Sequence, residues 1–134
     1  MVSSRQEDAR RRQELADAAL RNESVAAQVL IDEFVATAAA RGLRPAPLRA
    51  LLMDGTRVKS DQVGWYINKG QTLAIAPDGR FFKLLTTGGR FARFTRVKLS
   101  PSLPPMVVGR GGRDGETGDL KDFLDRTLDD YATA

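Results

Sequence analysis

Turn signals recur at roughly ten-residue intervals between residues 47 and 99, and this spacing constrains the fold more than any other feature of the sequence. The signals are short combinations of Gly, Asp, Asn and Pro that favour tight turns: Asp54-Gly55, Asn68-Lys69-Gly70, Pro77-Asp78-Gly79 and Gly88-Gly89. The pattern predicts an antiparallel β meander of about five strands. It places residues 56–58 and 63–67 in separate strands and Gly70 in the left-handed conformation. An open sheet and a closed barrel are both compatible with it.

The sequence before the meander predicts one long helix, from about residue 4 to residue 41. Apolar residues at helical spacing form its core-facing stripe: Ala27, Leu30, Phe34 and Ala38. Gly42, followed by Pro45, marks its end. At 1.5 Å per residue this helix would be about 57 Å long, well beyond the body of a domain of this size. Residues 1–23 have few apolar side chains, so we expect a charged helical extension, with residues 22–24 as a candidate interruption.

The sequence after the meander predicts a loop and a second helix. Residues 101–118 are rich in Pro and Gly and are expected to form a loop, and residues 119–134 are expected to form an amphipathic helix. Its apolar residues share one face: Leu120, Phe123, Leu124, Leu128 and Tyr131. We therefore predict one α+β domain, with a long N-terminal helix, an antiparallel β meander of about five strands and a C-terminal amphipathic helix packed on the sheet. Within this domain, residues 24–100 are expected to form the core, which consists of the apolar part of the first helix and the antiparallel sheet.

The composition removes several classes of chemistry. The chain has 134 residues and contains neither Cys nor His, which excludes thiolate nucleophiles, imidazole bases and metal sites built from these ligands. The Gly-rich stretch at residues 109–118 lacks the spacing of a phosphate-binding loop. The acidic run from Asp114 to Asp125 lacks the Gly and Glu positions of a calcium loop. We predict that the protein is not an enzyme and has no catalytic, cofactor-binding or metal-binding residues.

The charge of the chain is strongly segregated. Formal charges sum to −2 over residues 1–40, to +11 over residues 41–113 and to −5 over residues 114–134. A basic centre between acidic ends suggests two arrangements. In one, the acidic C-terminal helix shields the basic strands; in the other, the basic strands face an external polyanion.

Basic residues interleaved with aromatic ones mark a candidate interaction surface on the later strands. The candidate residues are Arg80, Lys83, Arg90, Arg93, Arg96, Lys98 and Tyr66. The basic residues among them are interleaved with Phe81, Phe82, Phe91 and Phe94. Exposed aromatic side chains between cations can stack on nucleic-acid bases. In the competing interpretation the Phe side chains face the core and the cations are solvated.

These observations predict a small, non-enzymatic interaction protein. We expect it to bind another protein, or a second copy of itself, through the first helix, because that helix outruns its own core, with an exposed sheet edge as a further candidate surface. The alternative is nucleic-acid binding through the basic, aromatic-interleaved sheet face. The N-terminal residues carry no signal-peptide pattern, and apolar runs are far shorter than a membrane span. We therefore expect a cytoplasmic protein that requires no cofactor and has no membrane partner.

Overall fold

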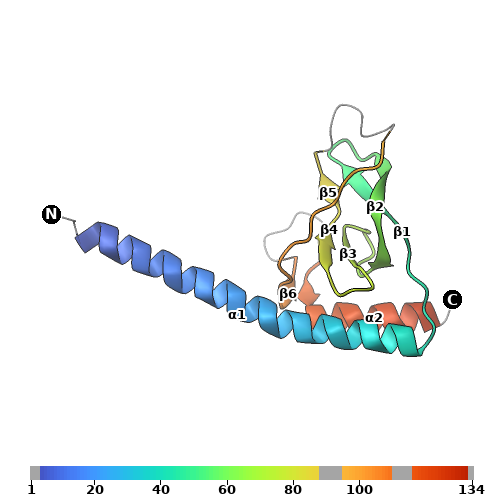
Figure 1. Cartoon of the computed structure of the whole chain (residues 1–134), viewed down its shortest axis with the longest axis horizontal. Coiled ribbons are helices and arrows are strands. Elements are labelled where there is room, and N and C mark those ends of the chain that lie inside the picture. Colours follow the sequence, from blue (N-terminus) through green and yellow to red (C-terminus); the bar gives the residue numbers. More distant parts are fainter. Residues whose placement is uncertain (1–3, 88–94, 110–115, 133–134) are drawn as a thin grey trace.

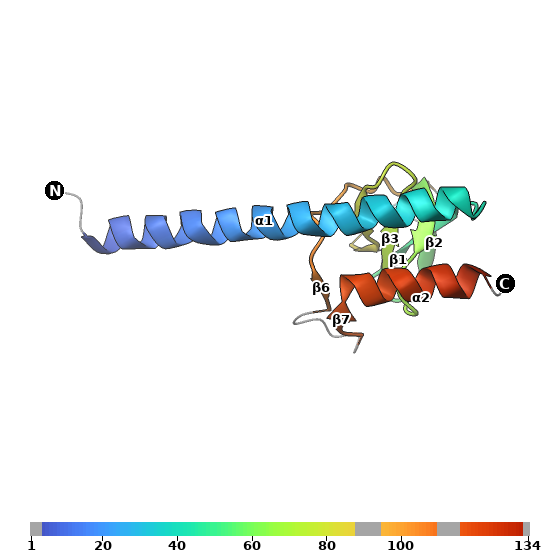
Figure 2. The same ribbon diagram turned by 90° about the horizontal axis from the view of Figure 1, so that it is seen from below.

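The structure, a computed structural model, describes residues 4–87, 95–109 and 116–132. Its elements in chain order are α1 (Ser4–Ala40), β1 (Ala46–Leu52), β2 (Arg57–Tyr66), β3 (Leu73–Ile75), β4 (Phe81–Lys83), β5 (Leu85–Thr86), β6 (Val107–Val108), β7 (Gly118–Asp119) and α2 (Leu120–Ala132). The two helices lie side by side on one side of the sheet (Figures 1 and 2). The predicted α+β class, with a long N-terminal helix and a C-terminal helix on the sheet, is confirmed.

Helix α1 is continuous from Ser4 to Ala40, so the candidate interruption at residues 22–24 does not occur. Its end is the predicted glycine cap. Gly42 has a φ of 72°, and the amides of Gly42 and Leu43 donate to the carbonyls of Ala39 and Ala38 at 3.1 and 2.9 Å. This pair of bonds satisfies carbonyls that the end of the helix would leave free. The N-terminal half of α1 extends far beyond the rest of the molecule (Figure 1).

Strands β1 to β5 form a five-stranded sheet in the order β4-β3-β2-β1-β5, and this sheet closes on itself through hydrogen bonds of Leu84. Strands β4 and β5 are separated only by Leu84. The amide of Leu84 donates to the carbonyl of Thr72 at 2.8 Å, and its own carbonyl accepts from the amide of Leu51 at 2.8 Å. The short segment that contains β4 and β5 therefore pairs with β3 on one side and with β1 on the other. The β1–β5 pair is parallel, which corrects the prediction of a wholly antiparallel meander.

Strand β2 joins two segments that the sequence predicted as separate strands. The pairing of β1 with β2 shifts between the pairs Pro47↔Val63 and Arg49↔Lys59, so β2 contains extra residues there. The hydroxyl of Ser60 lies in this irregular stretch and donates to the carbonyl of Leu48 at 2.6 Å. A side-chain bond thus bridges the interruption in the backbone ladder, and the strand continues through it.

Residues 95–99 lie beside this irregular stretch of β2. The amide of Val97 donates to the carbonyl of Lys59 at 2.8 Å, and the amide of Asp61 donates to the carbonyl of Val97 at 3.0 Å. The carboxylate of Asp61 also accepts from the amide of Leu99 at 3.0 Å. These bonds give Asp61 a structural role, because they anchor the returning chain against β2.

Alternate residues of the strands supply two separate cores. Trp65, Ile67, Ile75 and Phe81 face the helices, where the rings of Trp65 and of Phe34 in α1 form a T-shaped contact with a centroid distance of 5.7 Å. The side chains inside the closed sheet form the other core: Leu48, Ala50, Leu52, Val58, Ala74, Ala76, Phe82, Leu84 and Leu99. The helices therefore cover one outer face of the sheet, and the side chains of the strands themselves fill the interior of the closed sheet.

Two local predictions need correction. In the turn after β2, Gly70 does not adopt the left-handed conformation; Gln71 does, with a φ of 54°. The stretch predicted as a loop at residues 101–118 contains β6 and one residue of β7, which pair antiparallel through Val107↔Asp119 and Val108↔Gly118. The predicted turns at Gly55 and Gly79 are confirmed, with φ values of 89° and 88°, whereas the predicted turn at Gly88-Gly89 lies outside the described residues. The apolar stripe of α2 packs in the helix-side core as predicted.

Candidate functional site

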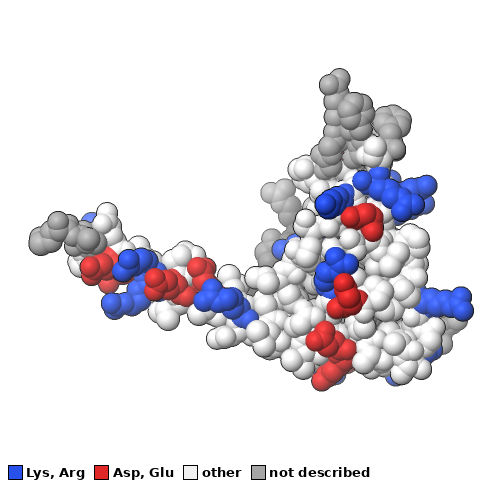
Figure 3. Space-filling model, viewed as in Figure 1, with Lys and Arg blue, Asp and Glu red and all other residues white. Residues whose placement is uncertain are grey.

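The outer face of β1, β2 and residues 95–99 is basic. Because Leu48, Ala50 and Val58 point into the closed sheet, the residues between them point outward. We call the following set the cationic face: Arg49, Arg57, Lys59, Arg96 and Lys98. A groove of about 540 Å³ crosses it, lined by Arg49, Thr56, Arg57, Val58, Lys59, Thr95 and Arg96. In Figure 3 the largest group of Lys and Arg side chains lies over the end of the body farthest from α1.

The cations of this face have few partners of opposite charge. The guanidinium of Arg57 donates to the carbonyls of Gly70 and Gln71, both at 2.6 Å. Within residues 4–87, 95–109 and 116–132, the ion pairs are Arg10–Glu14, Arg80–Asp78 and Lys121–Asp125. No described carboxylate therefore forms an ion pair with Arg49, Lys59 or Arg96.

The structure separates the residues predicted as one interaction surface. Arg96 and Lys98 belong to the cationic face, whereas Arg80 lies beside the β3–β4 turn. The Arg80 guanidinium contacts Asp78 at 2.6 Å and donates to Gln62 at 3.0 Å. Lys83 is exposed at the end of β4. Arg90 and Arg93 lie outside the described residues.

Tyr66, the aromatic member of the predicted set, packs against the interior core and does not line the groove of the cationic face. Its hydroxyl accepts from the backbone amide of Arg49 at 2.9 Å, and its ring lines a pocket beneath α2. Phe81 and Phe82 are both buried, one in each core. The expectation of exposed aromatic rings between the cations therefore rests on Phe91 and Phe94, which the structure does not describe.

Sequence reasoning missed three members of the cationic face, Arg49, Arg57 and Lys59. The signal was present, because these residues alternate with apolar ones along two adjacent strands. What the alternation does not reveal is that residues 95–99 return beside β2 and bring Arg96 and Lys98 to the same face. The bridge between Ser60 and Val97 makes that connection.

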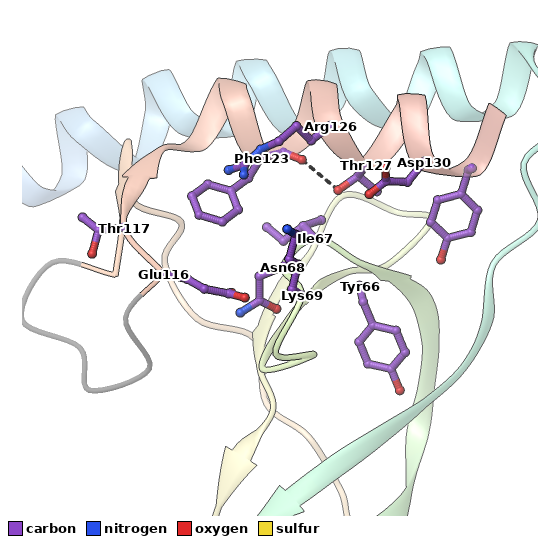
Figure 4. Close-up of a pocket in the computed structure, with 11 residues that line it drawn as sticks. Tyr66, Ile67, Asn68, Lys69, Glu116, Thr117, Phe123, Arg126, Thr127 and Asp130 are labelled. Carbon is purple, nitrogen blue, oxygen red and sulfur yellow. Dashed lines mark hydrogen bonds between the residues drawn. The ribbon is translucent and has the colours of Figure 1, made fainter. Parts of the chain in front are cut away.

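A second hollow lies between α2 and the turn after β2 (Figure 4). It has a volume of about 350 Å³ and is lined by Tyr66, Ile67, Asn68, Lys69, Glu116, Thr117, Phe123, Arg126, Thr127, Asp130 and Tyr131. One carboxylate oxygen of Glu116 accepts from the amide of Gly70 at 2.9 Å. The other is buried and has no hydrogen-bond partner among the described residues. Basic and acidic side chains both line this pocket, so its charges suit a small polar molecule better than a polyanion.

Several polar groups of this pocket are engaged in holding the fold. The side chain of Asn68 accepts from the amides of Thr72 and Leu73 and donates to the hydroxyl of Thr72. The guanidinium of Arg126 lies 4.5 Å from the centre of the Phe123 ring. Burial raises the pKa of the Tyr131 hydroxyl above its ordinary value, and the nearby Tyr66 raises it further.

A third surface runs along α1 on the side away from the body. We call it the α1 outer row: Leu15, Ala18, Asn22, Val25 and Val29. Its large apolar members are strongly exposed, Leu15 at 65%, Val25 at 66% and Val29 at 53%. The residues that α1 buries against the body are Ala27, Ile31, Phe34 and Ala38. With 3.6 residues per turn, these two rows lie on opposite sides of the helix.

Comparison with known proteins finds no relative. No family model matches the chain, and no curated protein or solved structure is significantly similar to it. The geometry of the three surfaces therefore carries the functional interpretation. None of the helices in the described part of the chain combines the length and hydropathy of a membrane span.

Proposed function

We propose that this is a non-enzymatic interaction protein that associates with a second copy of itself through α1. The observation that carries the proposal is the exposure of the α1 outer row, on a helix whose N-terminal half extends beyond the body. A helix with apolar side chains on two opposite sides has a face that its own domain does not cover. Exposed apolar faces of this kind are typical of surfaces that bind another helix.

The spacing of the row favours a parallel coiled coil. Its residues follow intervals of three and four, which places Leu15, Asn22 and Val29 at a positions of the heptad repeat, with Ala18 and Val25 at d positions. Asn22 occupies the central a position. An Asn at one a position fixes register and favours two parallel strands, because two such side chains can hydrogen-bond across the interface.

The charges of the extension support a second copy as the occupant. Residues 4–26 contain five Arg and five acidic residues, so this part of α1 is neutral and would not repel its equivalent. In a parallel pair in register, Glu7 at a g position faces Arg12 at the following e position of the second copy. This charge pair occurs twice by symmetry.

The position of the body is compatible with such a pair. The closed sheet and α2 pack against the side of α1 opposite to the outer row, and the two helices lie side by side there (Figure 2). Two copies joined along the outer row would therefore carry their bodies on the outside of the pair. The row covers only about two heptads, so we expect weak, concentration-dependent association.

Sedimentation equilibrium over a range of concentrations tests the proposal. We expect a monomer–dimer equilibrium for the full chain and a monomer for the double variant Val25→Lys with Val29→Lys. The matched control is Met53→Lys with Val63→Lys, which alters two exposed apolar residues away from α1 and should leave the dimer intact. A monomer at every concentration, or equal loss of the dimer in the control, would contradict the proposal. A monomer that nevertheless binds another protein through the same valines would assign the row to a different partner.

The absence of Cys from the chain allows a direct test of orientation. Oxidation of Asn22→Cys should give a covalent dimer rapidly, because a parallel pair in register brings residue 22 of both copies together. Ala9→Cys lies on the other side of α1 and should cross-link slowly. Equal cross-linking of the two variants would exclude a parallel pair along the outer row.

A further inference from the structure

Three neighbouring chain segments form the cationic face: β1, β2 and residues 95–99. Each contributes one basic side chain at the same register position across the sheet. Arg49 of β1 lies directly opposite Lys59 of β2 in the ladder. The parallel bridge between Ser60 and Val97 places Arg96 on the other side of Lys59. Since adjacent strands lie about 4.8 Å apart, these three side chains form a row across the sheet. Lys98 continues it along residues 95–99.

This row is electrostatically unfavourable in the isolated protein. Like charges directly opposite each other on adjacent strands destabilise a sheet. Among the ion pairs of the described residues, none joins a carboxylate to Arg49, Lys59 or Arg96. A bound anion would offset this repulsion, and the groove along the row is large enough, at about 540 Å³, to admit one.

The acidic residues of α2 do not neutralise the face. Asp122, Asp125 and Asp129 are exposed on α2, which packs beside α1 at the end of the body away from the β1–β2 turn (Figure 1). Lys121, also on α2, forms an ion pair with Asp125 at 2.7 Å. The arrangement in which the acidic helix shields these strands is therefore not the one seen here.

We propose that the cationic face binds the phosphodiester backbone of nucleic acid without base preference. Among the described residues, the groove is lined by four cations and two hydroxyl-bearing Thr residues, with Val58 as the single apolar member. Arg, Lys and Thr side chains are typical contacts to phosphate oxygens. The centre of a protein–protein interface is instead depleted in charge and rich in apolar and aromatic groups.

The expected lack of base preference follows from the aromatic residues. Phe81 and Phe82 are buried, and the hydroxyl of Tyr66 accepts the amide of Arg49 while its ring lines the pocket under α2. No described aromatic side chain lines the groove, so the described part of its lining offers the bases no stacking platform. The contacts are then electrostatic, and binding depends on phosphates in duplex and single strand alike.

Fluorescence anisotropy with a labelled 20-base-pair DNA duplex and each of its single strands tests this proposal on the full chain. With four phosphate contacts, from Arg49, Lys59, Arg96 and Lys98, the slope of log K against log salt concentration should be about −3.6 for the duplex. Neutralising two of them in Lys59→Gln with Arg96→Gln should reduce the slope to about −2. The reversals Lys59→Glu with Arg96→Glu should weaken binding by at least about tenfold.

The matched control is Arg41→Glu with Arg44→Glu, which changes the net charge equally but alters exposed residues between α1 and β1. It should retain most of the affinity. An equal loss in this control would show attraction by net charge alone and would overturn the proposal. So would a strong dependence on base sequence, or tighter binding of a poly-glutamate peptide of the same charge as the DNA.

Discussion

The backbone amide of Leu51 donates to the carbonyl of Leu84 at 2.8 Å, and this bond joins the two ends of the sheet. Leu84 is fully buried in the interior core, whereas its neighbour Leu85 is 51% exposed. A single residue therefore supplies both a closing hydrogen bond and a core side chain. The stability of the closed sheet should depend strongly on Leu84 and little on Leu85.

Leu84→Ala should lower the free energy of unfolding by about 2–5 kcal/mol, because it removes buried methyl groups and leaves a cavity. The control Leu85→Ala should change it by less than about 0.5 kcal/mol. Urea denaturation monitored by circular dichroism measures both. Equal effects of the two substitutions would show that the Leu84 side chain is not buried inside the closed sheet.

Gly64→Ala should destabilise the pairing of β2 with β3. A Cβ atom at residue 64 would lie within 2.2 Å of the carbonyl oxygen of Ile75, so the two backbones would have to separate. We expect a loss of about 1–3 kcal/mol in unfolding free energy. Gly70→Ala is the control. The nearest atoms to a Cβ at residue 70 would be 3.9 Å away, so this substitution should leave the unfolding free energy nearly unchanged. A stable Gly64→Ala variant would contradict this close approach.

Lys59→Glu should stabilise the protein while weakening its binding to nucleic acid. The substitution replaces a like-charge pair with Arg49 by an opposite-charge pair, which is worth about 0.2–1 kcal/mol between adjacent strands. Thermal unfolding at low salt measures the gain, and it should shrink at high salt because exposed charges are screened. Lys69→Glu, at an exposed turn position, should give no comparable gain. A fall in stability would show that the cationic face is not under repulsion.

Tyr131 should make the protein less stable at high pH. Its folded-state pKa is raised above 10.0, first by burial and then by Tyr66, so the unfolded chain loses this proton more readily. The corresponding stability is complete below pH 10 and is lost as the pH rises through the folded-state pKa. Tyr131→Phe should therefore show a shallower fall in unfolding free energy above pH 10. Identical pH profiles for the two proteins would contradict a half-buried hydroxyl that is held neutral in the folded state.

Local features of this protein were predictable because their causes lie within a few residues. The end of α1 follows from Gly42, whose left-handed conformation satisfies nearby carbonyls. The turns at Gly55 and Gly79 follow from the same conformational freedom. The turn after β2 was assigned wrongly at one residue, because Asn68 holds the amides of Thr72 and Leu73 and leaves the positive φ to Gln71.

The candidate surfaces show the same division between features with local causes, which were predictable, and features that depend on the tertiary structure, which were not. The charged extension of α1 was predicted from periodicity, since a helix orients its own side chains. The cationic face was predicted only in part, through Arg96 and Lys98. Its other members, Arg49, Arg57 and Lys59, come from a hairpin that lies far from residues 95–99 in the chain.

By itself, the sequence determined the helices, most of the turns and the alternation of apolar and polar residues along each strand, because backbone torsions and neighbouring side chains act locally. Only the tertiary structure decided that Leu84 closes the sheet, that β2 runs unbroken past Ser60, and that Arg96 lies beside Lys59. These outcomes depend on which strand edges meet in space. Strand pairing joins backbone groups without regard to their separation in the chain, so a local pattern does not specify it.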